Sequence, residues 1–386
     1  MVFLIKRLPL LASIGVLAMV LSSCLEKDSK TERSDRAATA TGDILIGTAW
    51  PLNSAKKKLK NGVILAQEQI NAGGGILGRN VKIDFRDDEK NVTKGIRIAY
   101  DFVNNLDMVA VIGHLNSYVS LATSSVYEFG GMLMITPGSS ASKITHQGFN
   151  LVFRTIPDNK NQGFQLAQYA KDKGYKKMML YYIKNSYGRD LANSFEKYAN
   201  LNGIEIVDRT SYQKGSSNYG RAMQYWADFY DFDAIFLAGY LPESAKIIQM
   251  ARKAGISKPF LGGAGLDASS LISLGGKEVE GTVVTSFFHP DMQHPKSVAF
   301  TKLYEKRFGE RPESVAAQGY DALMLLAHGM TKANSTVPSD VAAALRQTKD
   351  WEGATGSHTV KDNGDMLHKK IAKKIVREGR FEYLSD

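Results

Sequence analysis

From residue 43 onward, the chain alternates short runs of β-branched and apolar residues with longer stretches of helical periodicity. Residues 43–49 predict a strand. Residues 60–71 predict a helix, because their apolar side chains recur at a period of about 3.6 residues. Strands that alternate with helices imply βαβ crossovers and a mainly parallel sheet with helices on its faces. The predicted fold class is therefore α/β.

The alternation runs through the chain twice. Further strands are predicted at 81–85, 108–112 and 132–136 in the first series, and at 177–182, 204–209, 233–237, 259–261 and 282–285 in the second. A chain of 386 residues is too long for one ordinary domain and suits two. We therefore expect two doubly wound parallel-sheet lobes joined by a hinge, with a small-molecule site between them at the carboxyl ends of the strands.

The N-terminus has the pattern of a secretion signal. Basic residues precede an apolar stretch at 8–21, which is too short to span a bilayer comfortably, and two serines precede Cys24. This Leu-Ser-Ser-Cys ending resembles the bacterial lipobox, in which the cysteine is lipidated and becomes the mature N-terminus. Cys24 is the only cysteine, so an intramolecular disulfide and a cysteine-based metal site are excluded. We predict a lipoprotein signal peptide over 1–24 and lipidation of Cys24, the alternative being an ordinary signal peptide with an incidental cysteine.

Residues 25–42 are polar and charged. Such a composition buries too little apolar surface to fold, so this segment is predicted to be a flexible tether. Acyl chains would hold the folded part at a membrane surface. The predicted location is the bacterial cell envelope, lipid-anchored and extracytoplasmic, facing the periplasm in a Gram-negative cell. Leu25, which follows the cysteine, leaves open which membrane holds the anchor.

The formal net charge is +10, but lysine and arginine are spread along the whole chain. The densest runs, at 56–58 and 369–374, are short and lack interleaved aromatic residues. Nucleic-acid-binding proteins concentrate their basic residues on one face or helix. We therefore expect no nucleic-acid partner.

Motifs of enzyme sites are incomplete. Of two glycine patterns, the one at 73–78 lies between a helix and a strand, in the reverse order to a dinucleotide loop, and the one at 263–268 lacks the acidic residue expected after the next strand. Walker A and Gly-x-Ser-x-Gly sequences are absent. His289, Asp291 and His294 lie near two prolines and are interpreted as surface loop residues. We predict no enzyme, no catalytic residue, no cofactor and no metal.

Several stretches resemble the type I periplasmic binding proteins, specifically the leucine/isoleucine/valine-binding branch of ABC importer receptors. They are INAGGGILGR (70–79), VIGHLNS (111–117), LMITPGSS (133–140), SYGRDLA (186–192), AGYLPE (238–243), GGAG (262–265) and QGYDA (318–322). The resemblance implies an extracytoplasmic solute-binding receptor that closes on a small carboxylate-bearing or amino-acid-like ligand and docks on ABC permease subunits. It also implies an N-terminal lobe of 43–157 plus 287–365 and a C-terminal lobe of 158–286 plus 366–386.

Two loops of the first lobe are the predicted carboxylate site. Asn116 and Ser117 stand where a helix begins, and free N–H groups with the positive dipole end favour an anion there. Gly138, Ser139 and Ser140 follow a proline, on a turn that offers hydroxyls and close backbone approach. By resemblance, Ser117, Gly138 and Ser140 hold the ligand's carboxylate and main-chain part. The alternative for the serines is an ordinary role in a helix cap or turn.

Three aromatic residues are predicted to form pocket walls. Tyr187 and Tyr240 match aromatics of the second lobe that close over the ligand in the family, and a tyrosine combines an apolar face with a polar tip. Trp50, at the end of the first strand, is a candidate floor. Packing at a lobe surface is the alternative for the tyrosines, and the hydrophobic core is the alternative for Trp50.

One position departs from the family pattern. Amino-acid-binding members carry an acidic residue in the loop that matches 262–265, where it pairs with the ligand's ammonium group, and here that position is Ala264. Asp267 is the candidate substitute, unless it caps the following helix. A buried ammonium group without a counter-charge is costly. The lysine run at 56–58 would favour an anionic ligand, the alternative being a solvated surface run.

Two roles fit such a protein. The first is the capture receptor of an ABC importer. The second is an envelope lipoprotein of the same fold that acts as a ligand sensor or regulates a partner protein. Neighbouring permease and ATPase genes would favour the first role.

Overall fold

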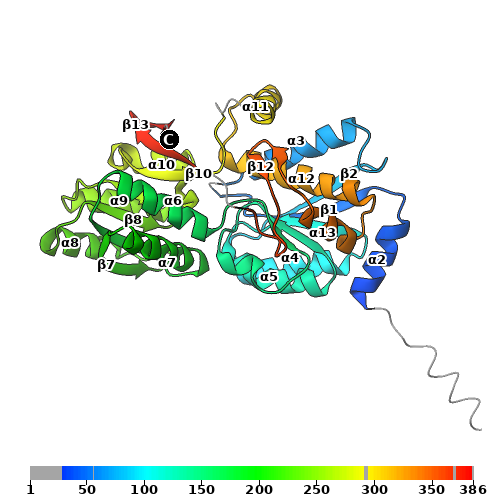
Figure 1. Cartoon of the computed structure of the whole chain (residues 1–386), viewed down its shortest axis with the longest axis horizontal. Coiled ribbons are helices and arrows are strands. Elements are labelled where there is room, and N and C mark those ends of the chain that lie inside the picture. The colour runs from blue at the N-terminus through cyan, green and yellow to red at the C-terminus, as the bar shows by residue number, and fades with distance from the viewer. Residues whose placement is uncertain (1–27, 55, 291–293, 368–370, 385–386) are drawn as a thin grey trace, which may run out of the picture.

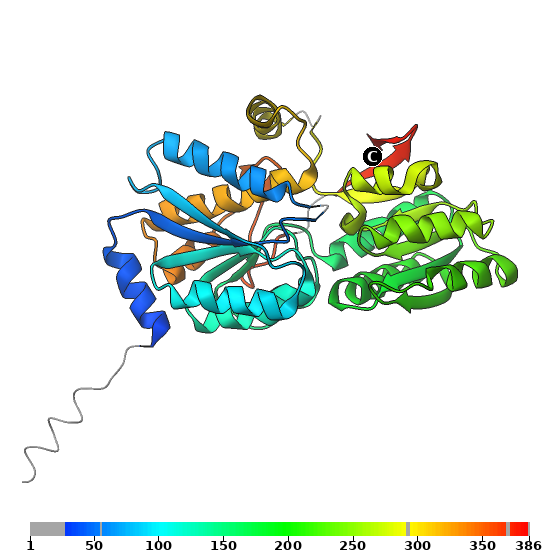
Figure 2. The same ribbon diagram turned by 180° about the vertical axis from the view of Figure 1, so that it is seen from behind.

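The computed structural model describes residues 28–54, 56–290, 294–367 and 371–384. Figure 1 shows two α/β lobes side by side, and Figure 2 shows the same arrangement from behind. Cys24 and the whole predicted signal peptide lie outside the described residues. Within those residues, no helix combines the length and the apolar character needed to cross a membrane.

The first lobe is built on a five-stranded sheet of order β2-β1-β3-β4-β5, in which every pair of neighbours is parallel. The strands are β1 (Ile44–Ala49), β2 (Val81–Arg86), β3 (Met108–Gly113), β4 (Leu133–Thr136) and β5 (Val152–Arg154). The helices are α3 (Leu59–Ala72), α4 (Val92–Asn104), α5 (Ser117–Phe129), η1 (Ser142–Thr145), α11 (Pro295–Phe308), α12 (Ser314–Ala333) and α13 (Pro338–Arg346). A small hairpin of β11 (Trp351–Gly353) and β12 (Gly356–His358) completes the lobe.

Side chains alternate between the two faces of this sheet, as strand geometry requires. Ile46 and Ile112 pack with α3 and α12 on one face, whereas Val111 and Met134 pack with α4 and α5 on the other. The central strands therefore carry continuous apolar runs, which is typical of a parallel sheet covered on both sides. The lobe has a core on each face of its sheet.

The second lobe is built on a seven-stranded sheet of order β14-β13-β10-β9-β8-β6-β7. The strands are β6 (Lys177–Ile183), β7 (Glu205–Tyr212), β8 (Ala234–Ala238), β9 (Phe260–Gly262), β10 (Val283–Ser286), β13 (Ala372–Arg377) and β14 (Arg380–Tyr383). The helices are α6 (Asn159–Asp172), α7 (Ser186–Leu201), α8 (Tyr219–Phe229), α9 (Glu243–Lys253), η2 (Ala264–Leu266), α10 (Ser270–Gly275) and η3 (Gly276–Val279). The last two strands of the chain run antiparallel at one edge of an otherwise parallel sheet.

The chain passes between the lobes three times. It leaves the first lobe after β5, returns to it after β10, and joins the second lobe again before β13. Each lobe is therefore made from segments distant in sequence. In other proteins, hinge motions take place at a few connecting residues of this kind.

The prediction of a flexible tether over 25–42 is wrong for its described part, because Ser29–Thr39 form helix α2. Figures 1 and 2 show this helix at the outer end of the first lobe, away from the second lobe. Arg33 is fully buried, and its guanidinium group donates hydrogen bonds to the carbonyls of Gly130 and Asn105, both at 2.9 Å, and to those of Val103 and Met108. Several of these carbonyls stand at the ends of α4 and α5, where helices leave acceptors without internal partners. One cationic side chain therefore anchors a segment whose composition predicts disorder.

Candidate functional site

A cavity of about 720 Å³ lies between the two lobes. Its lining comes from the segments that follow β1 to β5 in the first lobe and β6 to β10 in the second. The carboxyl ends of both sheets therefore face the same space, which is where α/β sheets bind ligands. The predicted site residues in this lining are Asn116, Gly138, Ser140, Tyr187, Tyr240 and Ala264.

The predicted serines divide into two groups. Ser140 lines the cavity, whereas Ser117 and Ser139 are buried outside the lining and connect the two ligand loops. The Ser117 hydroxyl accepts a hydrogen bond from the backbone N–H of Ala141 at 3.2 Å. The Ser139 hydroxyl lies 3.0 Å from the carbonyl of His114, to which it donates. Ser117 and Ser139 therefore hold the loops that present Ser140, which corresponds to the turn role left open as their alternative.

Asn116 stands at the N-cap of α5 and lines the cavity while being 3% exposed. Its side-chain amide contacts the hydroxyl of Tyr240 across the cleft, so it joins the two lobes. Its carboxamide oxygen is buried and has no protein hydrogen-bond partner. A buried polar atom without a partner is costly, so this amide is poised to bind a ligand group.

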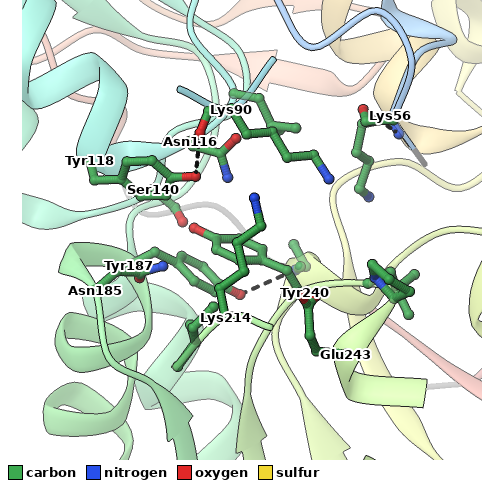
Figure 3. A pocket seen from close by; sticks show the side chains of 18 of the residues that line it. Lys56, Lys90, Asn116, Tyr118, Ser140, Asn185, Tyr187, Lys214, Tyr240 and Glu243 are labelled. Atoms are coloured by element: carbon green, nitrogen blue, oxygen red, sulfur yellow. Dashed lines mark hydrogen bonds between the residues drawn. The ribbon is translucent and has the colours of Figure 1, made fainter. Parts of the chain in front are cut away.

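Tyr187 and Tyr240 form the aromatic wall of the second lobe. Their rings stack with centroids 4.6 Å apart and an interplanar angle of 21°. The Tyr187 hydroxyl accepts a hydrogen bond from the backbone N–H of Gly265 at 3.2 Å (Figure 3). Burial raises the pKa of both phenols, so both are neutral at physiological pH.

Trp50 lies beneath the site rather than in it. Its ring is buried, its indole N–H donates to the carbonyl of Lys56 at 2.9 Å, and it is absent from the cavity lining. A Cβ atom on Gly138 would lie 2.5 Å from this ring, so only glycine fits there. The prediction of Trp50 as the pocket floor is therefore corrected to the core alternative, in which the ring supports Gly138 and the loop after β1.

Asp267 is not available to a ligand ammonium group. It is 3% exposed, lies outside the cavity lining and forms an ion pair with Lys374, while its carbonyl accepts a hydrogen bond from Lys56. Burial acts to raise the pKa of its carboxyl group, but Lys374 and Lys56 outweigh that effect and lower it. The prediction that Asp267 replaces the missing acid is wrong, because two lysines already compensate its charge. Ala264 does line the cavity, and it carries no charge.

The lining contains a group of cationic residues, of which the sequence singles out only Lys56 as favouring an anionic ligand. Among the described residues it includes five cationic side chains and the carboxylate of Glu243; the cationic residues are Lys56, Lys90, Lys184, Arg189 and Lys214. Lys56, Lys90, Lys184 and Lys214 lie in loops, whereas Arg189 lies in α7, within the SYGRDLA stretch. The one usable signal is position, because Lys90 follows β2 and Lys214 follows β7 at the ends that face the cleft.

The lysine run at 56–58 divides among three environments. Lys56 lines the cavity, Lys57 is exposed, and Lys58 pairs with Glu310 at 2.9 Å and Glu313 at 3.3 Å. The surface alternative therefore holds for Lys57 and is wrong for Lys56.

A buried polar network lies behind the first-lobe loops. The Asp88 carboxylate is 2.7 Å from Nδ1 of His114, and Nε2 of His114 is 3.1 Å from the hydroxyl of Tyr127. The other oxygen of Asp88 accepts a hydrogen bond from the backbone N–H of Lys90 at 2.9 Å. The network lies outside the cavity lining and fixes the loop after β2 against the loop after β3.

The two described histidines of the loop after β10 have other contacts. The His289 ring stacks on Tyr383 with centroids 3.4 Å apart, and Nε2 of His294 lies 2.7 Å from a carboxylate oxygen of Glu352. Asp291 lies outside the described residues. Within the described part of the chain, no three His, Cys, Asp or Glu residues are grouped as metal ligands would be.

The periplasmic binding protein family matches residues 50–372 of this chain. The chain belongs to this family. The Leu/Ile/Val-binding protein homolog 2 of Brucella abortus is 28% identical over 334 residues, which cover 85% of this chain and 88% of that protein. The leucine-, isoleucine-, valine-, threonine- and alanine-binding protein of Pseudomonas aeruginosa is 27% identical over 306 residues, or 79% of this chain and 81% of its own length.

Solved structures support the assignment of this chain to the periplasmic binding protein family. An ABC transporter substrate-binding protein from Desulfitobacterium hafniense in complex with Leu is 36% identical, with a TM-score of 0.79, and the match covers 89% of this chain and 100% of that one. A leucine-binding protein from Thermotoga maritima is 28% identical with a TM-score of 0.84, covering 89% and 98% of the two chains. The family and fold predicted from the sequence are confirmed. The chain is an extracytoplasmic solute-binding protein with two α/β lobes.

Proposed function

We propose that this protein is the capture receptor of an ABC importer, and that its lobes close by hinge motion around a small carboxylate-bearing ligand. The observation that carries the proposal is the cavity of about 720 Å³ between the lobes, lined by loops at the carboxyl ends of both sheets. Relatives described as substrate-binding proteins of ABC transporters support the transport role. Permease subunits are then the partners of the closed form. We propose that the hinge lies at the three crossings, near the lobe boundaries predicted from the sequence.

Three polar contacts between the lobes support closure as the working motion. Asp190 of α7 accepts hydrogen bonds from the backbone N–H and the hydroxyl of Ser142, at 2.8 and 3.1 Å. Ser269 donates to Glu313 at 2.8 Å, and Lys56 donates to the carbonyl of Asp267. A ligand that contacts both lobes adds to these contacts and therefore shifts the population toward the closed form.

The ligand's carboxylate is proposed to bind at the start of α5 and the loop after β4. Asn116, Gly138 and Ser140 line the cavity there, with the helix N-terminus of α5 beside them. Oriented N–H groups at a helix start favour an anion. Tyr187 and Tyr240 would cover the apolar part of the ligand from the second lobe. The polar groups around the cavity are interpreted as binding groups, so we propose that the protein is not an enzyme.

Membrane attachment is proposed to occur through lipid on Cys24, after removal of the residues that precede this cysteine. The Leu-Ser-Ser-Cys sequence at the end of the apolar stretch supports this proposal. Helix α2 begins at Ser29, so the link between anchor and folded part would be short. Substitution of Cys24 by alanine should move the protein from the membrane fraction to the soluble one, and retention in the membrane fraction would contradict lipid anchoring.

Mass spectrometry of small molecules released on denaturation tests the capture role. We expect a carboxylate-bearing compound in the same molar amount as the purified protein. Adding it back to the refolded protein should raise the melting temperature, because a ligand that binds the native state stabilises it. Release of no small molecule, together with no thermal shift across a panel of organic acids and amino acids, would contradict the proposal.

A further inference from the structure

We infer that the ligand is a small organic dianion, with one carboxylate at Asn116 and Ser140 and a second anionic group between Lys90 and Lys214. A zwitterionic neutral amino acid does not suit this charge arrangement. The inference rests on the proposed function, because it takes the cleft between the lobes as the solute site. The carboxylate end is shared with the proposed function, and the cationic end is the new element.

Three lysines converge on the cavity from different segments. Figure 3 shows the side chains of Lys56, Lys90 and Lys214 extending into the same space between the lobes. Lys56 already has the carbonyl of Asp267 as a partner, and it also attracts the Asp267 carboxylate. Lys90 and Lys214 form no ion pair within the described part of the chain, so their charges are available to a ligand.

Lys90 is held in place by its backbone. It has a left-handed conformation with φ of 57°, directly after Glu89 with φ of 52°. For residues other than glycine, this backbone conformation costs free energy. Such strain is maintained only when surrounding contacts require it. The contact here is the hydrogen bond from the Lys90 backbone N–H to the buried Asp88 carboxylate. Asp88 therefore fixes the backbone from which the Lys90 side chain enters the cavity.

Lys90 and Lys214 come from opposite lobes and repel each other. Burial lowers the pKa of Lys90 and the nearby Lys214 lowers it further, while Glu243 and Asp88 act in the opposite direction. If the lobes close without a ligand, this repulsion remains, because like charges that face each other across an interface cost free energy. An anionic group between the two ammonium groups converts the repulsion into two attractions. The pair therefore couples ligand charge to closure.

The cavity offers little to an ammonium group. The position that is acidic in amino-acid-binding relatives by resemblance is Ala264, and the buried Asp267 is compensated by two lysines. Glu243 is the one carboxylate in the described lining. It is the first residue of α9, where the helix dipole stabilises it, and it attracts Lys90. Five cationic side chains against one carboxylate select for negative charge.

Isothermal titration calorimetry on the full-length protein, stripped of ligand by denaturation and refolding, tests the inference. The probes are succinate, glutarate and adipate, the monocarboxylates of matching length, glutamate, and leucine, isoleucine and valine. We expect the best dicarboxylate to bind about 100-fold more tightly than its matched monocarboxylate and than any neutral amino acid. Tightest binding by leucine, isoleucine or valine would overturn the dianion while leaving the proposed function intact. Absence of binding by every probe, with no small molecule released on denaturation, would overturn both.

Two variants locate the second anionic group. Lys90→Gln should weaken dicarboxylate binding about 30-fold, and the more exposed Lys214→Gln should weaken it about 5-fold, because exposed charges are screened by water. Binding of the matched monocarboxylate should change little in either variant. Lys253→Gln is the control, because Lys253 is an exposed residue in the last turn of α9 and lies outside the cavity lining. Unchanged dicarboxylate affinity in both Lys90→Gln and Lys214→Gln, with melting temperatures equal to that of the control, would overturn the inference.

Discussion

At the scale of single residues, the charge of a ligand that this cleft accepts depends on a few side chains around η2. Ala264 contributes a methyl group to the cavity, and its backbone N–H donates to Gln162 at 3.1 Å. Asp267 lies three residues further on, where Lys374 and Lys56 compensate it. The nearest buried carboxylate is thus used inside the protein. The charge of the ligand is therefore set by the cationic residues of the cavity lining.

An acid placed at Ala264 should alter ligand choice. Ala264→Glu supplies a carboxylate to the cavity, so leucine affinity should rise by about 10-fold or more and dicarboxylate affinity should fall, because opposite charges attract and like charges repel across a desolvated contact. Calorimetric titrations with leucine and glutarate measure both effects. Ala264→Gln has the same size without the charge and is the control. An equal response of both variants would show that shape, rather than charge, sets the preference.

Loss of the Asp267 carboxylate should destabilise the fold. Asp267→Asn leaves Lys374 buried without its counter-charge, so the free energy of unfolding should fall by about 3–5 kcal/mol. Denaturant titrations measure this change. The double variant Asp267→Asn with Lys374→Met should recover most of the loss, because no unpaired charge is then buried. A double variant as unstable as the single one would contradict this account of the pair.

The same carboxylate predicts a pH dependence. Lysine charges lower the folded-state pKa of Asp267 below the ordinary 3.8, although burial acts in the opposite direction. Its contribution to stability is therefore fully present above the unfolded-state pKa and is lost as the pH falls through the lower, folded-state value. The difference in unfolding free energy between the natural protein and Asp267→Asn should be constant above that range and shrink below it. A difference that grows on acidification would contradict the sign of the shift.

At the scale of helices and strands, α2 shows how a short polar segment acquires structure. The Asp28 side chain caps the helix by accepting from the backbone N–H of Thr31 at 2.8 Å, and Ala37 packs against the first-lobe core. The buried Arg33 then joins the helix to the ends of α4 and α5. Tertiary contacts therefore stabilise a helix in a segment whose composition alone predicts disorder.

Two arginines of α2 provide a matched pair for measurement. Arg33→Met removes the N–H groups that donate hydrogen bonds to four backbone carbonyls. The free energy of unfolding should therefore fall by about 2–4 kcal/mol. Arg36→Met removes exposed ion pairs with Glu32 and Asp107 and should change stability little. Denaturant titration of both variants makes the comparison. Equal effects would show that burial of Arg33 does not anchor the helix.

Sequence periodicity predicted most elements because apolar burial sets it. Helix α3 extends one residue beyond the predicted range at each end, and β3 is longer than predicted by one residue. Strands β5, β11 and β12 were not predicted, since three residues are too few to show alternation. The contacts of Arg33 are also invisible in the sequence, because its carbonyl partners are 70 to 97 residues away.

The candidate site was predictable only in part. Gly138 and Ser140 were found because turn chemistry and resemblance point to the same loop. Lys90 and Lys214 follow strands in loops without a motif, and only the three-dimensional fold brings them together. Asp267 was assigned to the ligand because its partner Lys374 lies more than a hundred positions later, on a strand that joins the same sheet.

At the scale of the whole molecule, the two lobes meet through few polar contacts. Ser142 of the first lobe donates a hydrogen bond to Asp190 of the second, and Ser269 of the second lobe donates one to Glu313 of the first. The cavity between the lobes has a volume of about 720 Å³. Closure is therefore a balance of a few polar contacts, lysine repulsion and the ligand.

Asp190→Ala should shift that balance toward the open form. It removes the acceptor for two hydrogen bonds from Ser142, so ligand affinity should fall by about 3- to 10-fold without loss of fold. Calorimetry with the best dicarboxylate measures the change. Asp228→Ala removes an exposed carboxylate of α8 in the same lobe and is the control. Unchanged affinity in Asp190→Ala would exclude this contact from the closure equilibrium.

Small-angle X-ray scattering of the stripped protein, with and without saturating glutarate or leucine, tests most directly whether the lobes close around a dianion. We expect a smaller radius of gyration with glutarate and an unchanged one with leucine. An unchanged radius in the presence of bound glutarate, or compaction by leucine in place of glutarate, would contradict it.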